Sequence, residues 1–404
     1  MPGALPVRST SDQEVSDEAT TETQRLNHGG DRRPIAAPAE RSRGVLNEMN
    51  AMKRSRALFV VLTAVLALAA CTAEQGGGSP DATSTEGGGG YHIGVSNTLT
   101  NNGWREEMIC SIRAQALVSG EVAELTVHHR DTDAAGQLED LRTLIADDVD
   151  AIIVNPVSPD AVNEALAEAN EAGIPVISVD QAVTEGSAYL IANNQEEYAY
   201  LGATWLFEAM GGSGDVVYMR GFAGHPADDD RHAGFQRALE EHPDINVVHE
   251  VHTGWDQATG TQQINDFLAT GENYDGIWTS GIDNVIVDAL VAADAELVPI
   301  VGADNAGFVQ QLLEVEGLVG AAVTNPASVG GAGVTLALQL LNGEEPESQE
   351  VLMEPALWAN DTEEGRAELE AANDPDIDPT WPLGISIEGW TDYTKEQILA
   401  CEGP

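Results

Sequence analysis

Polar side chains recur in this sequence at the points where buried strands are expected to end. Asp180 ends the segment PVISVD, Asp304 ends PIVGAD, Asn325 ends GAAVTN, and Asp283 lies just after WTSG. A single Asp at such a point often caps the next helix. Four such polar ends indicate a ligand site, because the carboxyl ends of parallel strands meet at one edge of an α/β sheet, where ligands bind. Carboxylates and amides there would hydrogen-bond the hydroxyl groups of a small ligand.

Two tryptophans and two arginines accompany these polar ends. Residues 91–116 show a buried strand pattern, a polar turn, and an amphipathic helix that starts near Trp104, with Arg105 beside it. Arg231 opens the helix expected in DDDRHAGF, and Trp255 follows a later strand. An indole offers a flat apolar face and a guanidinium a fixed fork of donors, which together suit a sugar ring with vicinal hydroxyls. The alternative for Trp104 is that it only packs the first turn of its own helix.

The sequence lacks the motifs of common catalytic and metal sites. It contains no GxSxG elbow, Walker A segment, HExxH or CxxC. His128 and His129 are adjacent on an expected strand and therefore point to opposite faces, and the pair His225 and His232 lacks a third ligand. The acidic run before Arg231 is better placed to cap a helix than to bind calcium. We therefore expect a binding protein that is not an enzyme and that uses no metal ion or cofactor.

The charge balance argues against nucleic acid as a partner. The 404 residues include 67 acidic and 18 basic side chains, a net charge of −49, which repels a phosphate backbone. Such an acidic excess keeps a protein soluble and suits a salty medium, so we interpret it as a halotolerant or extracytoplasmic surface. The length and the hydrophobic content of 42% are sufficient for two α/β domains with ordinary cores.

Strand and helix patterns alternate along the chain, which predicts an α/β fold with parallel sheets. Strands are expected at His92–Ser96, Glu124–His128, Ala151–Asn155, Pro175–Asp180, Ala188–Ala192, Asp215–Gly221, Asn246–His252, Gly276–Ser280, Val298–Asp304 and Gly320–Asn325. Helices are expected at Asp160–Ala172, Tyr198–Met210, Arg231–His242, Gln257–Thr270, Asn284–Ala292 and Ser328–Leu341, among others. Ten strands are many for one sheet. We expect a division near 192–195 into two Rossmann-like lobes, 91–193 with part of 326–404, and 194–325.

The first ninety residues indicate an export signal followed by a tether. A basic start at Met52–Arg56 precedes an apolar run, Ala57–Ala70, that is too short to span a bilayer. The segment Leu68–Cys71 resembles a lipobox, which would make Cys71 the lipidated first residue of the mature protein; a buried core helix is the alternative. Residues 1–51 are then an over-called, disordered start, 52–70 a lipoprotein signal peptide, and 71–90 a Gly/Ser-rich tether. The protein is expected outside the cytoplasm, anchored by lipid to the cell membrane.

The cysteine count supports a cross-link. With Cys71 committed to lipid, two of the three cysteines remain: Cys110 in the first helix and Cys401 in the C-terminal segment. An even number in an exported protein favours a disulfide between them, which would tie the C-terminal segment to the first lobe. Two free buried thiols are the alternative.

Five segments carry a resemblance to a known family, and they are GVSNTLTNNGWREEM, VDAIIVNPVSPDAVNEALAEANEAGIPVISVD, DRHAGFQRAL, GWDQATG and PIVGADNAGFVQQLL. Through them the chain from about Tyr91 to Asn342 resembles the ribose- and galactofuranose-type sugar-binding proteins of bacterial ABC importers. These proteins share the type I periplasmic binding protein fold with the ligand domains of LacI-like repressors. The resemblance implies two lobes, joined by three crossings of the chain, that close like a hinge around one small ligand.

The resemblance also implies roles for the residues introduced above. Trp104 and Trp255 take the positions of two aromatic residues that face the sugar ring from opposite lobes. Asp180, Arg231 and Asp304 match the carboxylates and guanidinium that bind its hydroxyl groups. Further ligand contacts are implied for Asn102, Arg105, Asp283 and Asn325, with Thr324 as the alternative to Asn325.

Departures from the family pattern leave the identity of the sugar open. Gln181 stands where many members carry Arg, and Ile282 stands where an Asn commonly binds the ligand, so that Asp283 is expected to replace that contact. The C-terminal segment 350–404 is longer than in the small members. We expect it to wrap the first lobe or the hinge, with its tryptophans, Trp358, Trp381 and Trp390, serving packing more than ligand contact.

The resemblance implies that the protein, as a monomer, captures a monosaccharide (an aldose or furanose) or a similar polyol and delivers it to an ABC permease and its ATPase. The alternative is a sensor that presents its ligand to a membrane kinase or chemoreceptor. A LacI-type repressor would need an N-terminal helix-turn-helix, and the export signal and acidic charge contradict that function. A glycoside hydrolase would need a carboxylate pair across a scissile bond, whereas a closed pocket between two lobes suits the capture and release of a whole ligand.

Overall fold

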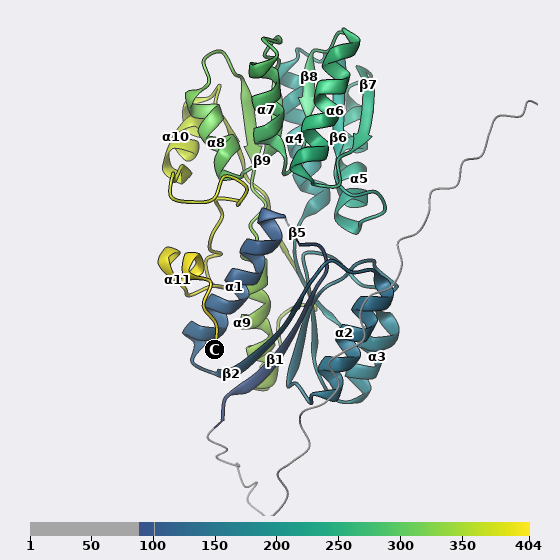
Figure 1. Ribbon diagram of the computed structural model, residues 1–404, viewed down its shortest axis with the longest axis vertical. Helices are drawn as coiled ribbons and strands as arrows, with labels where there is room; N and C mark the ends of the chain where they lie inside the picture. The colour runs from purple at the N-terminus through teal and green to yellow at the C-terminus, as the bar shows by residue number, and fades with distance from the viewer. Residues whose placement is uncertain (1–88, 101) are drawn as a thin grey trace, which may run out of the picture. The chain divides into compact units, whose positions relative to one another are not determined.

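The computed structural model describes residues 89–100 and 102–404. The predicted signal peptide, Cys71 and nearly all of the predicted tether lie outside the described residues. Within the described residues, strands and helices alternate and form two six-stranded sheets (Figure 1). No helix of this part of the chain combines the length and apolar character that a membrane span requires.

The first sheet has the strand order β11-β5-β4-β3-β1-β2, and every neighbouring pair is parallel. Its strands are β1 (Tyr91–Asn97), β2 (Val122–His129), β3 (Ala151–Asn155), β4 (Val176–Val179), β5 (Tyr189–Asn193) and β11 (Glu350–Met353). β3 and β4 are short apolar runs that are buried throughout, as expected for central strands with helices on both faces. Those helices are α1 (Gly103–Ser119) and α9 (Val329–Leu341) on one face, and α2 (Ala134–Ala146) and α3 (Asn163–Glu171) on the other (Figure 1). We term this assembly the first lobe.

The second sheet has the order β12-β10-β9-β8-β6-β7, with β12 antiparallel to β10 at one edge. Its strands are β6 (Ser213–Arg220), β7 (Asp244–His252), β8 (Gly276–Trp278), β9 (Ile300–Ala303), β10 (Gly320–Val323) and β12 (Leu357–Ala359). Alternate β6 residues face two separate apolar clusters, because successive strand side chains point to opposite faces. The covering helices are α4 (Gln195–Ala209), α5 (Pro226–Glu241), α6 (Gln257–Thr270), α7 (Asp283–Ala292), α8 (Ala306–Glu314) and α10 (Glu363–Ala372). This is the second lobe.

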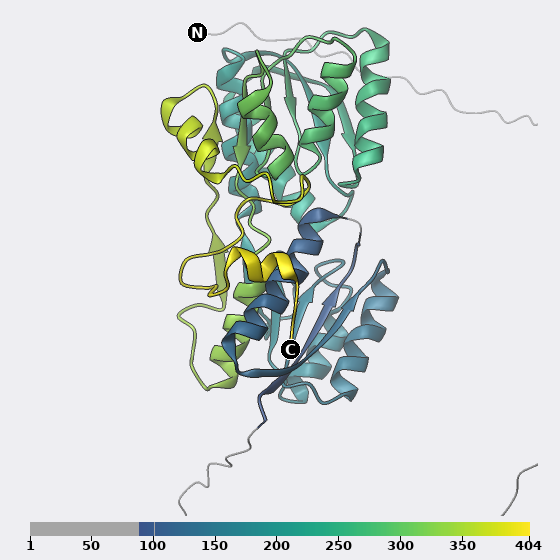
Figure 2. The same cartoon turned by 60° about the vertical axis from the view of Figure 1, so that its left-hand side comes forward.

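The chain passes between the two lobes four times. β5 leads into α4, β10 leads into α9, and β11 leads into β12, each time changing lobe. The fourth passage runs from α10, beside the second sheet, to α11 (Lys395–Ala400), beside α1 (Figure 2). We term residues 373–394, which make this passage, the strap. The three-crossing hinge implied by the family resemblance therefore has a further connection in this protein.

The expected strands are all present, with ends shifted by a few residues, and two further strands follow them. β11 and β12 each join a sheet edge, β11 beside β5 and β12 beside β10. One expected helix start is wrong: Arg231 does not open its helix, because α5 begins at Pro226. Proline suits the first turn of a helix, and Asp228 and Asp229 follow it there, so Arg231 lies in the second turn.

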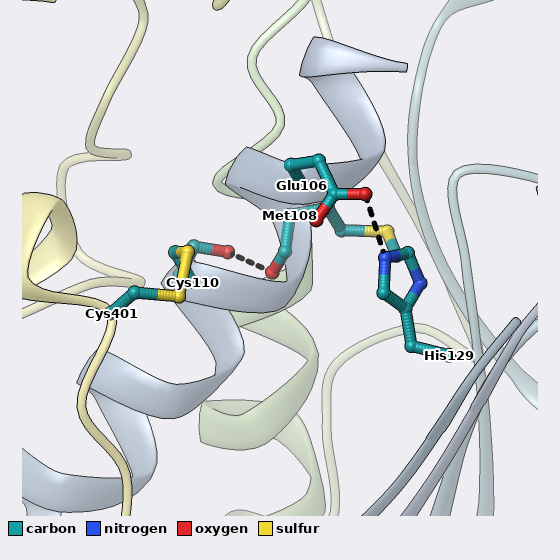
Figure 3. Close-up of a disulfide and its surroundings, with 6 residues drawn as sticks. Glu106, Met108, Cys110, His129 and Cys401 are labelled. Carbon is teal, nitrogen blue, oxygen red and sulfur yellow. Dashed lines mark hydrogen bonds and ion pairs between the residues drawn. A yellow bond between two sulfur atoms is a disulfide. The ribbon is translucent and has the colours of Figure 1, made fainter. Parts of the chain in front are cut away.

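The predicted cysteine pair is bonded in the structure. Cys110 of α1 and Cys401, which caps the carboxyl end of α11, form a disulfide across a sequence separation of 291 residues. Figure 3 shows Cys401 reaching α1 from the C-terminal segment, while Glu106 of the same helix hydrogen-bonds His129 at 2.9 Å. Cys110 packs with Ala114, Tyr393 and Ile398 in an apolar cluster that joins α1 to the end of the strap.

The closest helix pair of the second lobe depends on a glycine. A Cβ atom added at Gly234 of α5 would overlap the backbone carbonyl of Glu196 in α4. We expect Gly234→Ala to lower the free energy of unfolding by roughly 1–3 kcal/mol, because the two backbones must separate. Gly186→Ala is the matched control, since a Cβ there meets no atom within 4 Å. Urea unfolding curves compare the two variants, and equal stability would contradict this account of the α4–α5 contact.

Candidate ligand-binding site

A cavity of about 470 Å³ lies where the carboxyl ends of strands from both sheets meet. That volume is in the range of small-molecule sites in proteins. The structure brings together here all but one of the residues that the sequence predicts as ligand contacts, namely Asn102, Trp104, Arg105, Asp180, Arg231, Trp255, Asp304 and Asn325. Asp283 is the exception.

The start of α1 supplies one wall of the cavity. Asn102 is the N-cap of this helix, and its side-chain oxygen accepts a hydrogen bond from the Arg105 backbone N–H. Trp104 lines the cavity and also packs on the first core, and its Nε1 donates to the Asn325 carbonyl at 2.7 Å. Trp104 therefore packs on the core and lines the cavity at the same time. The buried Arg105 guanidinium donates from Nη1 to Asn97 Oδ1 at 2.7 Å, and burial lowers its pKa to about 10.

A hydrogen-bonded network of four side chains forms the inner end of the cavity. Gln195 stands at its centre: Nε2 donates to Asp180 Oδ1 and Asn325 Oδ1, each at 3.1 Å, and Oε1 accepts from Arg231 Nε at 2.8 Å. The Asn325 amide can also face the other way, which places its oxygen 3.1 Å from Arg231 Nη2. Burial raises the pKa of Asp180, and the charges of Arg105 and Arg231 oppose that shift. In either orientation of Asn325, Gln195 links Asp180 and Arg231 at the cavity wall.

His225, at the N-cap of α5, connects the two lobes within the site. Its Nε2 lies 3.1 Å from Arg105 Nη2 and 3.0 Å from Gln181 Nε2. Burial, together with the charges of Arg105 and Arg231, holds the His225 pKa well below its ordinary value, so the ring is neutral. Since a guanidinium can only donate, Nε2 is the acceptor and the proton sits on Nδ1. The Arg105 contact thereby selects the tautomer.

Trp255 holds an unusual backbone conformation at the opposite wall. Its φ of 54° lies in the left-handed region, which a bulky side chain rarely adopts. The indole ring occupies the space where Gly221 has no side chain, and it meets the His225 ring edge to face at 4.8 Å between centroids. Asp180, also in the cavity, has a φ of 67°. Such conformations persist where the surrounding structure imposes them, often at binding sites.

Five buried polar atoms that belong to cavity-lining residues have no hydrogen-bond partner within the described chain. They are His225 Nδ1, Trp255 Nε1, Ser280 Oγ, Asp304 Oδ2 and Asn305 Oδ1. Buried polar groups in proteins are nearly always hydrogen-bonded. A cluster of donors and acceptors in one cavity is therefore suited to a ligand rich in hydroxyl groups, each of which both donates and accepts.

Asp283 is a correction to the predicted site. It is fully buried beside the cavity and is not among the residues that line it. Its Oδ2 accepts from the Gly281 and Ala303 backbone N–H groups and from Asn305 Nδ2, at 3.0–3.1 Å. The carboxylate holds the β8–α7 loop and orients Asn305, and burial raises its pKa to about 6. Asp283 therefore supports a cavity residue, Asn305, and does not itself line the cavity.

Several cavity residues were missed in the sequence. Ser280 and Asn305 follow strand ends directly, in WTS and GADN, a signal that could have identified them. Gln195 begins α4 at the first passage between lobes, and His225 precedes Pro226, but neither position alone indicates a ligand. The strap adds Asp378, Thr380, Trp381 and Pro382 to the lining. Trp358 and Trp390 pack on the two cores, as expected, whereas Trp381 both packs and lines the cavity.

Asp304 should make the stability of the protein depend on pH. Burial raises its pKa from 3.8 to about 7, so between these values the folded protein holds a proton that the unfolded chain has released. The free energy of unfolding from this group should therefore fall as pH rises, by up to about 1.4 kcal/mol per pH unit. Urea unfolding at pH 5 and pH 7.5 should show this slope in wild type and a smaller one in Asp304→Asn.

The comparison of the two proteins separates Asp304 from groups that do not depend on its charge. Burial also raises the pKa of Asp180 and of Asp283, which contribute to the slope in both proteins. Burial raises the pKa of Glu107 as well, and the charge of Asp304 adds to that shift, so the difference between the slopes reports Asp304 together with this coupling. Equal slopes in the two proteins would contradict the assignment.

Among the described residues, no group of three or more His, Cys, Asp or Glu side chains is arranged to hold a metal ion.

Comparison with known proteins agrees with this geometry. Residues 93–345 match the model of the periplasmic binding protein domain. The chain is 27% identical over 240 residues to the xylitol-binding protein of Mycolicibacterium smegmatis, covering 58% of this chain and 68% of that protein. It is 26% identical over 229 residues to the ribose import binding protein RbsB of Haemophilus influenzae, covering 56% and 78%. An ABC transporter solute-binding protein from Bacillus halodurans, solved with bound myo-inositol, shares the fold with a TM-score of 0.64 at 24% identity, covering 71% and 99%.

Proposed function

Because the chain belongs to the periplasmic binding protein domain family, we propose that it is an extracytoplasmic receptor that captures a monosaccharide or similar polyol for an ABC importer. The ligand would bind between the lobes and pass to a membrane permease. The relatives described above are named as binding proteins and not as enzymes. The observation that supports it most directly is the set of buried polar atoms in the cavity that have no hydrogen-bond partner.

Those atoms fit a polyol in both chemistry and position. His225 Nδ1 and Trp255 Nε1 are donors, Asn305 Oδ1 is an acceptor, and the Ser280 hydroxyl can act as either. Trp104 and Trp255 add aromatic faces for the apolar side of a ring. The hydroxyl groups of a polyol could therefore each hydrogen-bond one of these unpaired donors or acceptors.

The charges around the cavity favour an uncharged ligand. Arg105 and Arg231 are its cationic lining residues, and both already face Asp180. The rest of the lining carries further carboxylates, at Glu106, Asp131, Asp256, Asp304 and Asp378. A sugar phosphate or sugar acid would meet repulsion without a free cation to offset it. Neutral sugars and polyols avoid this penalty.

Capture is proposed to work by a shift between open and closed arrangements of the lobes. Ligand contacts from Arg105 and Asp180 of the first lobe and from Trp255 and Ser280 of the second can be made together only when the lobes are closed. A ligand that uses both sets therefore stabilises the closed state. The closed surface would be the form that docks on the permease.

A thermal-shift screen tests this function. The chain from Thr72 to Pro404, purified and then refolded to remove bound ligand, is heated with xylitol, D-ribose, L-arabinose, myo-inositol and D-galactose. A ligand that binds only the folded state raises the melting temperature with its concentration. At least one of these compounds should do so, while ribose 5-phosphate and galacturonate should not. A cooperative melt that no neutral polyol shifts would contradict the proposal.

We also propose that Cys71, which lies outside the described residues, carries the lipid that anchors the receptor. The lipobox-like segment Leu68–Cys71 and the tether of residues 71–90 support this assignment. Expression in a bacterium with labelled palmitate should give a labelled, membrane-associated protein. Cys71→Ser should lose both label and membrane association, and retention of the label would refute the anchor. Light scattering on the protein from Thr72 onward tests the expected monomer.

A further inference from the structure

The strap is bonded to the second lobe at the edge of the cavity. The Ala306 and Gly307 N–H groups, at the start of α8, donate to the carbonyls of Trp381 and Pro379 at 2.8 and 2.9 Å. These are N-terminal helix donors that have no partner within their own helix. The Leu383 N–H donates to the Asp304 carbonyl at 2.9 Å. Backbone hydrogen bonds thus fix residues 379–383 beside two loops that line the site.

The strap also touches the first lobe directly. A Cβ atom added at Gly103, the first residue of α1, would overlap the hydroxyl and the carbonyl of Thr380. Beyond that contact, Ser328 Oγ donates to the Gly384 carbonyl at 2.8 Å, and Thr335 Oγ1 donates to the Trp390 carbonyl at 2.7 Å. The strap therefore spans the helix starts of both lobes at one side of the cavity.

Trp381 occupies the centre of this arrangement. Its side chain lines the cavity and packs against the core of the second lobe. It packs as well against the cluster that contains Cys110, Tyr393 and Ile398, against which Cys401 also packs. One indole therefore contacts the ligand cavity on one side and the surroundings of the disulfide on another.

From this geometry we propose that Trp381 is a ligand-contacting, specificity-determining residue, and that the Cys110–Cys401 disulfide holds it in the cavity wall. The inference rests on the proposed function, since the ligand is taken to be a neutral polyol. An indole fixed at one side of the cavity restricts the shape of the ligand that fits beside Trp104 and Trp255. It should therefore distinguish a rigid ring such as myo-inositol from a flexible chain such as xylitol.

Calorimetric titration of xylitol, D-ribose and myo-inositol tests this role. Trp381→Ala should weaken binding of the preferred compound by at least about tenfold and change the ratio of the xylitol and myo-inositol dissociation constants by a similar factor. Trp381→Phe should keep most of the affinity. The matched control is Trp358→Ala: Trp358 belongs to the same C-terminal segment and packs on the same core, but does not line the cavity. It should leave the ratio unchanged.

Each outcome bears on the proposal. If Trp381→Ala binds as Trp358→Ala does, Trp381 is a packing residue and the inference is wrong. If wild type binds none of these compounds, the proposed function fails and the specificity role with it. Wild-type binding with an unaltered Trp381→Ala ratio overturns the inference alone.

The role of the disulfide has a readout that needs no ligand. In Cys110→Ser/Cys401→Ser, the Ala306 amide, which donates to the Trp381 carbonyl, should exchange with deuterium at least about tenfold faster than in wild type. The Thr279 amide, which donates to the Val301 carbonyl in the second sheet, reports exchange through global unfolding, which loss of the cross-link also accelerates. No acceleration at Ala306, or an Ala306 rate in the variant no faster than that of Thr279, would refute the positioning role.

Discussion

Replacing Arg231 by alanine is expected to weaken polyol binding by about 3 kcal/mol, a loss on the order of a hundredfold in affinity. Its guanidinium is buried in the cavity, donates to Gln195 Oε1 and lies 4.2 Å above the Tyr198 ring. The variant removes a charged donor and also the opposite charge that Asp180 faces. Isothermal titration with the compound that most raises the melting temperature measures the loss.

The same helix provides a matched control for Arg231. Arg237 also lies on α5, but it forms exposed ion pairs with Glu196 and Glu197 and lies away from the cavity. Exposed ion pairs contribute little to stability, so Arg237→Ala should bind as wild type does. Arg231→Lys should recover only part of the affinity, because an ammonium cannot reproduce the planar fork of donors. Wild-type affinity in Arg231→Ala would remove Arg231 from the site.

Loss of the disulfide should have the largest effect on stability. A cross-link that closes a loop of 291 residues restricts the unfolded chain, and loop-closure entropy predicts a stabilisation on the order of 5 kcal/mol. Urea unfolding of Cys110→Ser/Cys401→Ser, followed by tryptophan fluorescence, should therefore show a much lower midpoint than oxidised wild type. Reduced wild type should behave like the variant.

One outcome of the urea experiment would contradict the stability role of the disulfide. If the oxidised protein and the serine variant unfold at the same urea concentration, the cross-link does not restrict the unfolded state as proposed. A change in the slope of the transition, with the midpoint unchanged, would point to altered compactness of the unfolded chain.

Much of the fold could be predicted from the sequence because local patterns agree with it. The apolar runs of β3 and β4, and the polar residues that end the strands, identify parallel sheets and the edge where the cavity lies. The polar turn and the helix that starts near Trp104 could be predicted because each has a local pattern. The cysteine pair followed from an even cysteine count in a chain predicted to be exported.

The errors have physical causes as well. Asp283 looks like Asp304 in the sequence, since each follows a strand, but in Asp283 the carboxylate turns inward to accept backbone N–H groups. No local pattern distinguishes these orientations. Trp381 belongs to an irregular segment without periodicity, and only the bonds of the strap to Ala306 and Asp304 bring it to the cavity. Tertiary contacts alone determine its place.

The exchange of edge strands between lobes constrains how the chain is assembled during synthesis. β5 of the first sheet pairs with β11, which is synthesised only after the strands β6 to β10 of the second sheet. Until then the β5 edge is unpaired, and an open strand edge invites aggregation. Chaperones would therefore protect the nascent chain from aggregation until β11 has been synthesised. Neither lobe corresponds to a contiguous gene segment, so recombination could not exchange one lobe without interrupting the sheet of the other.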